Sequence, residues 1–507
     1  MVSRLIILLL AIILAVPASA ADWLRAESEH YVVYADLDEQ ELRKLMQVME
    51  DFRRMLHGRI PPELPSARKL HLYIGKGNDI DWARIDRRIG ARNAKLEEAV
   101  GGALYFPGNQ PVLRHNAIFF ELAHYHIESG FKRSAPEWVT WGFGMVFKST
   151  YLDPQGRLVI GAPDISWPLR SPLNEAVIAE RLTRPTPREV RRRADGETPD
   201  EMRESREIIR PLLLDQRFSG QLEAYLNAYN AGQSLEEASR LIADRALLVT
   251  ASSQFNNTRR PPVRIIVLPP APPAEITVRA LGKDEAAVLF ARLARLIGGG
   301  DAKLIAERLE GETRRFPDSA PVWYEYAAAE FVRVQESDHG GTPLFRGMGF
   351  ANGELIVTAN RHPDRAAWDA VHRALALDPD HRPAQRLKAE ILMARLLREG
   401  GEDGSAEGFE AVRALLRPIA QDPEREPLAA ALYHQSYIEQ GIAPSSEAFD
   451  WLGRAFVANA GIEELRYAFA VALSRRGDKA LAERLLTSLL NSTETGNAAR
   501  RALEAAP

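Results

Sequence analysis

The chain has 507 residues, more than one hydrophobic core usually organises, so we expect at least two domains. Charged residues make up 26% and hydrophobic residues 46% of it, which excludes the disordered and fibrous classes. The formal net charge of −4 leaves no basic excess, which argues against nucleic acid or an anionic membrane as a partner.

The first twenty residues have the layout of a secretory signal peptide. Arg4 precedes an apolar run of twelve residues, and Ala18 and Ala20 stand at the spacing of a cleavage site. The run is short for a membrane span of about 20 residues, so we expect cleavage rather than an uncleaved anchor. The sequence has no cysteine, which fits an oxidising compartment. We therefore expect a periplasmic or secreted protein without membrane attachment after cleavage.

Residues 21–258 alternate between strand and helix patterns, which predicts an α+β domain. Alternating β-branched and aromatic residues predict strands, and apolar residues at helical spacing predict a helix that ends at Gly58. Further helices are expected around the segment 119–126, around 134–151 and over most of 171–250. The strands are expected at 30–36, 69–75, 102–108 and 157–161.

A proline-rich segment follows this domain. Residues 259–275 contain six prolines in seventeen positions, which excludes a helix and predicts an extended linker or edge segment. We place the domain boundary at this linker, over residues 259–282.

Residues 283–507 are rich in alanine and leucine and predict an all-α domain of helical repeats. One unit has Ala367, Val371, Ala374 and Pro379 at the spacing of a tetratricopeptide repeat, in which small residues let paired helices approach closely. The region resembles the tetratricopeptide family, with five degenerate helix pairs and a final capping helix. A generic helical bundle is the alternative. Partial matches to the same spacing are Leu309 with Pro317, Ala411 with Leu415 and Pro423, Ala448 with Leu452 and Ala455, and Ala482 with Leu486 and Leu489.

The sequence FFELAHYH at residues 119–126 contains a degenerate zinc-peptidase motif. In H-E-x-x-H the two histidines bind zinc from one helix face and the glutamate activates the metal-bound water. Glu121 and His124 keep this spacing, but Phe120 stands at the first histidine. Downstream, the run PEWVTWGFG has Trp141 where W-x-x-E-G would supply a third ligand. Residues 23–245 therefore resemble the gluzincin, peptidase MA-like domain.

The resemblance implies that the peptidase chemistry has been lost. Glu121 would be a vestigial general base and His124 a vestigial ligand, whereas the ligand positions at Phe120 and Trp141 are gone. One imidazole cannot supply the three protein donors of a catalytic zinc site, so we expect neither a metal nor another cofactor. We expect the two aromatic rings to fill the former metal cavity.

Two alternatives to this interpretation stay open. A rearranged metal site, and with it a zinc-dependent cell-envelope peptidase, could draw on a nearby supply of ligand types. The pairing of Glu121 with His124 could also be coincidental. The first interpretation predicts an exported, non-catalytic binding or scaffold protein whose concave repeat surface holds a protein or peptide partner. It leaves the oligomeric state open. The nearby ligand types are His115, Glu121, His124, His126, Glu128 and Glu137.

Overall fold

A computed structural model gives the architecture of the chain. The signal peptide predicted at residues 1–20 lies outside the residues that it describes. No helix within the described ranges has both the length and the apolar character that a membrane crossing requires. The described residues are 23–57, 68–75, 92–93, 100–107, 117–130, 135–155, 157–160, 173–184, 200–257, 264–267, 273–297, 301–338, 349–351, 354–356, 365–399, 406–490 and 495–504.

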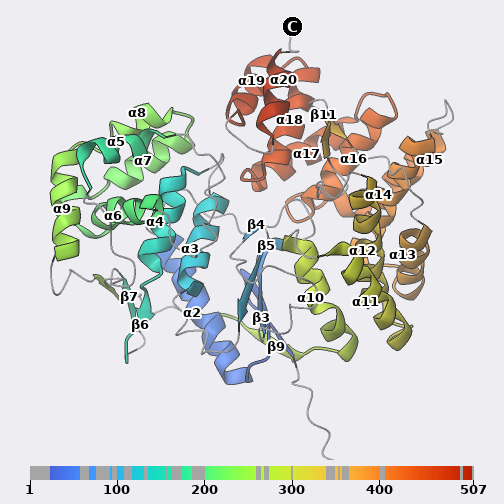
Figure 1. Cartoon of the computed structure of the whole chain (residues 1–507). Coiled ribbons are helices and arrows are strands. Elements are labelled where there is room, and N and C mark those ends of the chain that lie inside the picture. Colours follow the sequence, from blue (N-terminus) through green and yellow to red (C-terminus); the bar gives the residue numbers. More distant parts are fainter. Residues whose placement is uncertain are drawn as a thin grey trace, which may run out of the picture.

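A six-stranded mixed sheet, in the order β4-β5-β3-β2-β1-β9, lies between the helices of the N-terminal half and α10 (Figure 1). Strands β2, β3 and β5 pair in parallel, whereas β1, β4 and β9 pair antiparallel with their neighbours. The strands predicted at 30–36, 69–75 and 102–108 are confirmed as β2, β3 and β5. The bounds are β1 Leu24–Glu27, β2 Tyr31–Ala35, β3 Lys69–Gly75, β4 Arg92–Asn93, β5 Val100–Pro107 and β9 Thr277–Ala280.

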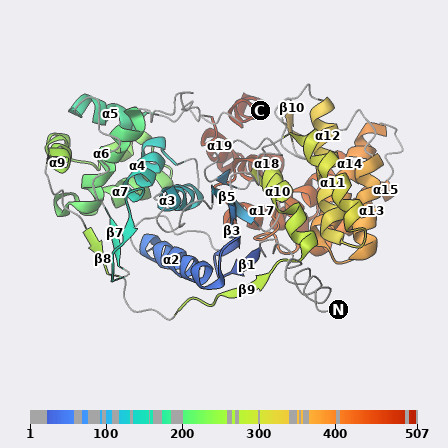
Figure 2. The ribbon, with the colours of Figure 1, turned by 60° about the horizontal axis from the view of Figure 1, so that its bottom comes forward.

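The two faces of this sheet belong to different hydrophobic clusters. Tyr31 and Val33 point to the face covered by helix α2 (Glu39–His57), the helix predicted to end at Gly58. Val32 and Tyr34 point to the opposite face, which is covered by α10 (Lys283–Ile297). Figure 2 shows the strands between these helices. Strand β2 is buried on both sides, which explains its unbroken apolar sequence.

Apart from a small second sheet, the remaining elements that the structure describes in the N-terminal half are helices. Helix α3 contains the motif segment, and α4 contains the tryptophan-rich run that follows it. Helix α4 packs between α3 and α6. The bounds are α3 Ala117–Gly130, α4 Glu137–Phe147, α5 Glu175–Thr183, α6 Asp200–Leu214, η4 Gln216–Phe218, α7 Gln221–Asn230, α8 Leu235–Ser239 and α9 Arg245–Asn257.

The proline-rich segment supplies an edge strand to each of two sheets. Strand β8 (Arg264–Ile266) pairs with β7 (Leu158–Ile160), the strand predicted at 157–161, and β7 pairs with β6 (Tyr151–Leu152). Strand β9 pairs with β1 at the edge of the large sheet. Edge positions suit proline-rich neighbours because an edge strand needs only one row of hydrogen bonds. Both strands therefore join sheets of the N-terminal half.

Helices α10 to α20 form the C-terminal half (Figure 1). Within the described residues they make five successive pairs and one final helix, the number predicted. Membership of the tetratricopeptide family stays a prediction. A hairpin of β10 (Gly349–Ala351) and β11 (Glu354–Ile356) lies between α12 and α13 in the sequence. The helices are α11 Ala302–Arg315, α12 Ala320–Asp338, α13 Arg365–Leu377, α14 Arg382–Glu399, α15 Ala406–Ala420, α16 Pro427–Glu439, α17 Ser446–Ala458, α18 Glu463–Arg475, α19 Lys479–Thr487 and α20 Gly496–Glu504.

The repeat spacing correctly predicts which residues are buried in α13, in α17 and over residues 482–489, but not in α15. In α15, Ala411 is exposed and Leu415 is half-buried, whereas Val412 and Leu416 are fully buried. The prediction was therefore wrong by one residue. Burying valine removes more apolar surface from water than burying alanine does, so the larger side chain sets the register. The residues buried as predicted are Ala367, Val371 and Ala374, then Ala448, Leu452 and Ala455, and then Ala482, Leu486 and Leu489.

Every second helix contributes to one inner layer of the repeats. Helices α10, α12, α14, α16 and α18 each contact the next in this series. In α16, all of residues 427–436 are buried, polar side chains included. This segment of α16 therefore offers no exposed side chain to a partner.

Candidate functional site

The structure brings the residues of the degenerate motif together. Phe120 and His124 lie one turn apart on α3 with stacked rings, whose centroids are 6.1 Å apart. Trp141 reaches them from α4, with its ring 5.0 Å from that of His124 and 6.1 Å from that of Phe120. The position predicted for a lost third ligand thus lies beside the motif helix.

Two methionines complete an apolar cluster around these rings. Phe120 is 8% exposed and packs with Met145 of α4 and Met202 of α6, which are both buried, while Trp141 lies against the cluster. Methionine suits such a position because its flexible thioether adapts to aromatic neighbours. The rings therefore occupy an apolar environment. That they fill a former metal cavity stays a prediction.

Two glycines of α4 allow this close packing. A Cβ atom at Gly144 would lie 2.8 Å from the Phe120 ring. A Cβ atom at Gly142 would lie 2.7 Å from the backbone oxygen of Ser205 on α6. Gly142 and Gly144 thus let α4 approach both neighbouring helices.

The donor set does not fit the zinc ion that the resemblance to gluzincins would imply. A catalytic zinc site takes three protein donors and keeps one position open. Phe120 and Trp141 supply no donor at two of these positions, which leaves the half-buried His124. Across the described ranges, no three His, Asp or Glu side chains are grouped so that they could share a metal ion.

The alternative ligand His126 has a different partner. It is buried, and its Nε2 lies 2.8 Å from the Tyr31 hydroxyl of β2. Burial lowers the pKa of His126 well below its usual value, and the nearby charge of Arg53 adds to this. Burial also raises the pKa of Tyr31. His126 therefore faces the sheet rather than the motif. His115 and the side chains of Glu128 and Glu137 lie outside the described residues.

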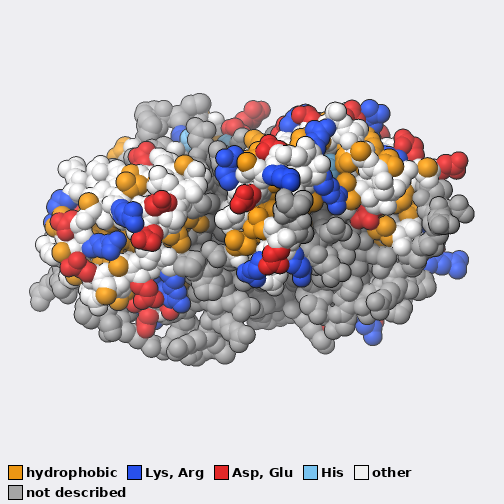
Figure 3. Space-filling model, turned by 90° about the horizontal axis from the view of Figure 1, so that it is seen from above, with side chains coloured by type: hydrophobic (Ala, Val, Ile, Leu, Met, Phe, Trp, Pro, Cys, Tyr) orange, Lys and Arg blue, Asp and Glu red, His pale blue; other side chains and the backbone are white. Residues whose placement is uncertain are grey.

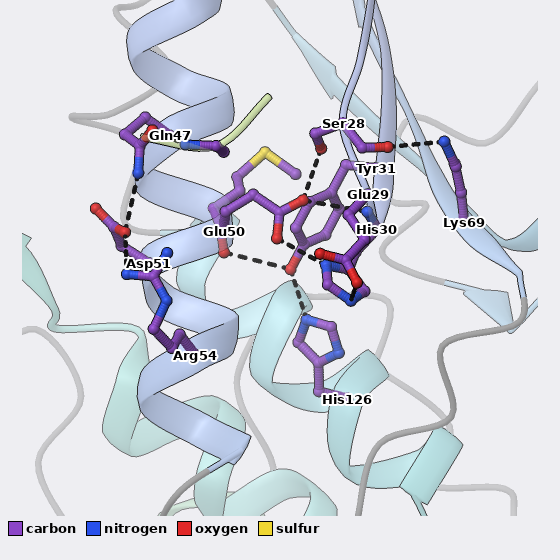
Figure 4. Close-up of polar contacts among 12 residues, drawn as sticks. Ser28, Glu29, His30, Tyr31, Gln47, Glu50, Asp51, Arg54, Lys69 and His126 are labelled. Atoms are coloured by element: carbon purple, nitrogen blue, oxygen red, sulfur yellow. Dashed lines mark hydrogen bonds and ion pairs between the residues drawn. The ribbon is translucent and has the colours of Figure 1, made fainter. Parts of the chain in front are cut away.

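A polar network that sequence reasoning missed surrounds this contact (Figure 4). Glu50 of α2 accepts hydrogen bonds from the Ser28 hydroxyl at 2.7 Å and from the His30 amide at 3.1 Å. Its second oxygen lies 2.8 Å from His30 Nδ1. Burial raises the pKa of Glu50, but hydrogen bonds from His30 and Ser28 outweigh it and leave the pKa lowered. The carboxylate holds the imidazole in place. No local motif signals the pair, since the two residues are twenty positions apart.

A second missed feature lies on α6, which packs against α4. Glu207 is fully buried, with Arg206 Nε at 2.7 Å and an Arg210 guanidinium nitrogen at 3.4 Å. Buried charges of this kind are paired because an unpaired charge in a core costs several kcal/mol. The run RESREIIR could have suggested them, because Arg203, Arg206 and Arg210 recur at helical spacing along the apolar face.

No protein-family model matches the chain, and a comparison with curated proteins finds no match either.

Proposed function

We propose that the protein is an exported, non-catalytic binding or scaffold protein. It combines a pseudo-metallopeptidase domain, related to the gluzincins, with tetratricopeptide-like repeats that bind a protein or peptide. The aromatic cluster is the observation that carries this proposal. Phe120 and Trp141 pack against His124 where a peptidase needs metal donors. Without a metal, Glu121 has no activated water to deprotonate.

The repeats support a recognition role because stacked helix pairs present long continuous surfaces. Because residues 427–436 of α16 are buried, we expect a partner to contact side chains that other parts of the repeats expose. In the described part of the repeats, the exposed large hydrophobic side chains are Ile442, at 44%, and Val457 of α17, at 74%. Among the described residues on the face seen in Figure 3, charges of both signs are interspersed and neither sign dominates. An apolar contact near α17 is therefore the proposed partner surface.

Replacing Val457 by aspartate is expected to abolish partner capture, because a charge would have to be desolvated inside an apolar contact. The measurement uses the mature protein as bait in a cell-envelope extract from the source organism and identifies the retained proteins. Val267→Asp is the matched control, since Val267 is 67% exposed but lies next to β8 in the N-terminal half.

A partner retained equally by both valine variants would rule out the α17 surface. Trp141→Ala tests whether the aromatic cluster also binds the partner. Loss of the same partner in this variant would assign the cluster a binding role. The competing function, a peptidase with non-standard ligands, predicts zinc-dependent hydrolysis of unfolded protein that His124→Ala abolishes.

A further inference from the structure

A cavity of about 850 Å³ lies in the N-terminal half, apart from the motif cluster. It has the volume of a small-molecule site, for which roughly 300–1,000 Å³ is typical. Its walls come from the turn between β1 and β2, from α2, from the start of β3 and from the extended residues 273–277. Figure 4 shows the side chains of this region that come from the turn, α2 and β3.

The extended wall is fixed in place by contacts with α2. The Ala274 amide donates to Gln47 Oε1 at 2.9 Å, and Arg43 donates to the Ile276 carbonyl at 2.8 Å. Strand β9 then continues this wall into the sheet by pairing with β1. The cavity is therefore preformed by segments far apart in sequence, which limits the ordering cost of binding.

Both signs of charge line the cavity. Lys69, with a side chain 33% exposed, donates to Glu27 at 2.6 Å. Arg54, 38% exposed, donates to Asp51 at 2.9 Å. The Glu29 side chain is 80% exposed, and Glu275 is exposed as well. Cationic and anionic groups are thus accessible around one hollow.

His30 adds a group that both donates and accepts. Its Nδ1 is held by the buried Glu50, and its Nε2 lies 3.5 Å from the Glu29 carboxylate on the exposed side. An imidazole oriented through one nitrogen presents the other in a fixed direction. The buried pair therefore builds one wall of the cavity and positions a hydrogen-bonding nitrogen near its opening.

We propose that this cavity binds a zwitterionic ligand, one that carries an ammonium and a carboxylate group, such as a free amino acid or a short peptide. An ion of a single sign would be attracted by one set of lining charges and repelled by the other. A zwitterion can direct its ammonium toward Glu29 or Glu275 and its carboxylate toward Lys69 or Arg54, which lie on opposite sides of the region in Figure 4. The inference is independent of the proposed function of the repeats.

Titration calorimetry with trialanine tests the proposal on the whole protein. Trialanine with free ends is compared with its N-acetylated and its C-amidated form, and free alanine is titrated separately to distinguish an amino acid from a peptide. Saturable binding of trialanine or alanine is expected, and blocking either end of trialanine should weaken its binding at least about tenfold.

The Glu29→Gln/Glu275→Gln variant is expected to weaken binding of the free ligand by a similar factor. Both side chains are exposed, so the fold should tolerate the change. Glu223→Gln, an exposed carboxylate on α7, is the matched control and should bind like the wild type. The proposal is overturned if neither ligand binds at millimolar concentration, if blocked and free trialanine bind equally, or if the double variant binds like the control.

Discussion

Replacing Glu325 by glutamine is expected to lower the free energy of unfolding by about 3–5 kcal/mol, the usual effect of removing one partner of a buried ion pair. Glu325 of α12 is 1% exposed. It accepts from Arg292 and from Arg295 of α10, each at 2.9 Å. Arg295 is itself 7% exposed, so the substitution leaves a buried guanidinium without its counter-charge.

Glu310→Gln is the matched control for this prediction. Glu310 pairs with Arg314 at 2.6 Å, but both side chains are at least half exposed. Exposed pairs contribute about 0–1 kcal/mol, so the control should unfold nearly like the wild type. Urea denaturation at neutral pH measures both variants. A loss for Glu325→Gln no larger than that of the control would show that the buried ion pair does not stabilise the contact between α10 and α12.

The protein is expected to lose stability as the pH falls from about 6.5 to 4, because two buried histidines resist protonation in the fold. Burial lowers the pKa of His434 to about 4, and the charges of Arg475 and Arg476 act in the same direction. The pKa of His126 is lowered well below its usual value for the same main reason. Below pH 6.5 the unfolded chain binds protons that the folded chain excludes, so unfolding is favoured.

Each pH unit between the two pKa values of one such histidine is worth about 1.4 kcal/mol, so His434 alone accounts for roughly 3 kcal/mol. Denaturation midpoints at pH 7.5 and pH 4.5 measure the effect. His434→Gln should lower the difference between the two pH values, whereas His57→Gln, at an exposed position of α2, should not. An unchanged difference in His434→Gln would contradict the assignment.

Runs of β-branched and aromatic residues were sufficient to predict the central strands β2 and β3, but nothing local predicted β1 or the edge strand β9. Strand β2 has an apolar sequence that nothing but a buried strand explains easily. Strands β1 and β9 are short and partly polar, and they exist because Leu24 pairs with Ala280 and its neighbours follow in register. A pairing across more than 250 residues leaves no local signal in either segment.

In the candidate site too, residues within the sequence motifs could be predicted, whereas a residue contributed by a distant helix could not. Motif spacing placed Phe120, His124 and Trp141 together, and the ring distances confirm that they meet. Met202, which completes the cluster, comes from α6. The helical pattern of α6 predicts an apolar face without naming the helix that it packs against. The polar cavity was missed because its walls come from four separate segments.

The zinc content of the wild-type protein and of the Phe120→His/Trp141→Glu variant tests the central claim most directly. The substitutions restore the donors that the resemblance to gluzincins assigns to these positions, beside His124. Elemental analysis after dialysis against trace zinc should give almost none for the wild type and about one ion per chain for the variant. About one ion per wild-type chain, lost in His124→Ala, would contradict the account. A folded variant that binds no zinc would also contradict the account, because the positions of Phe120 and Trp141 would then not be those of gluzincin zinc ligands.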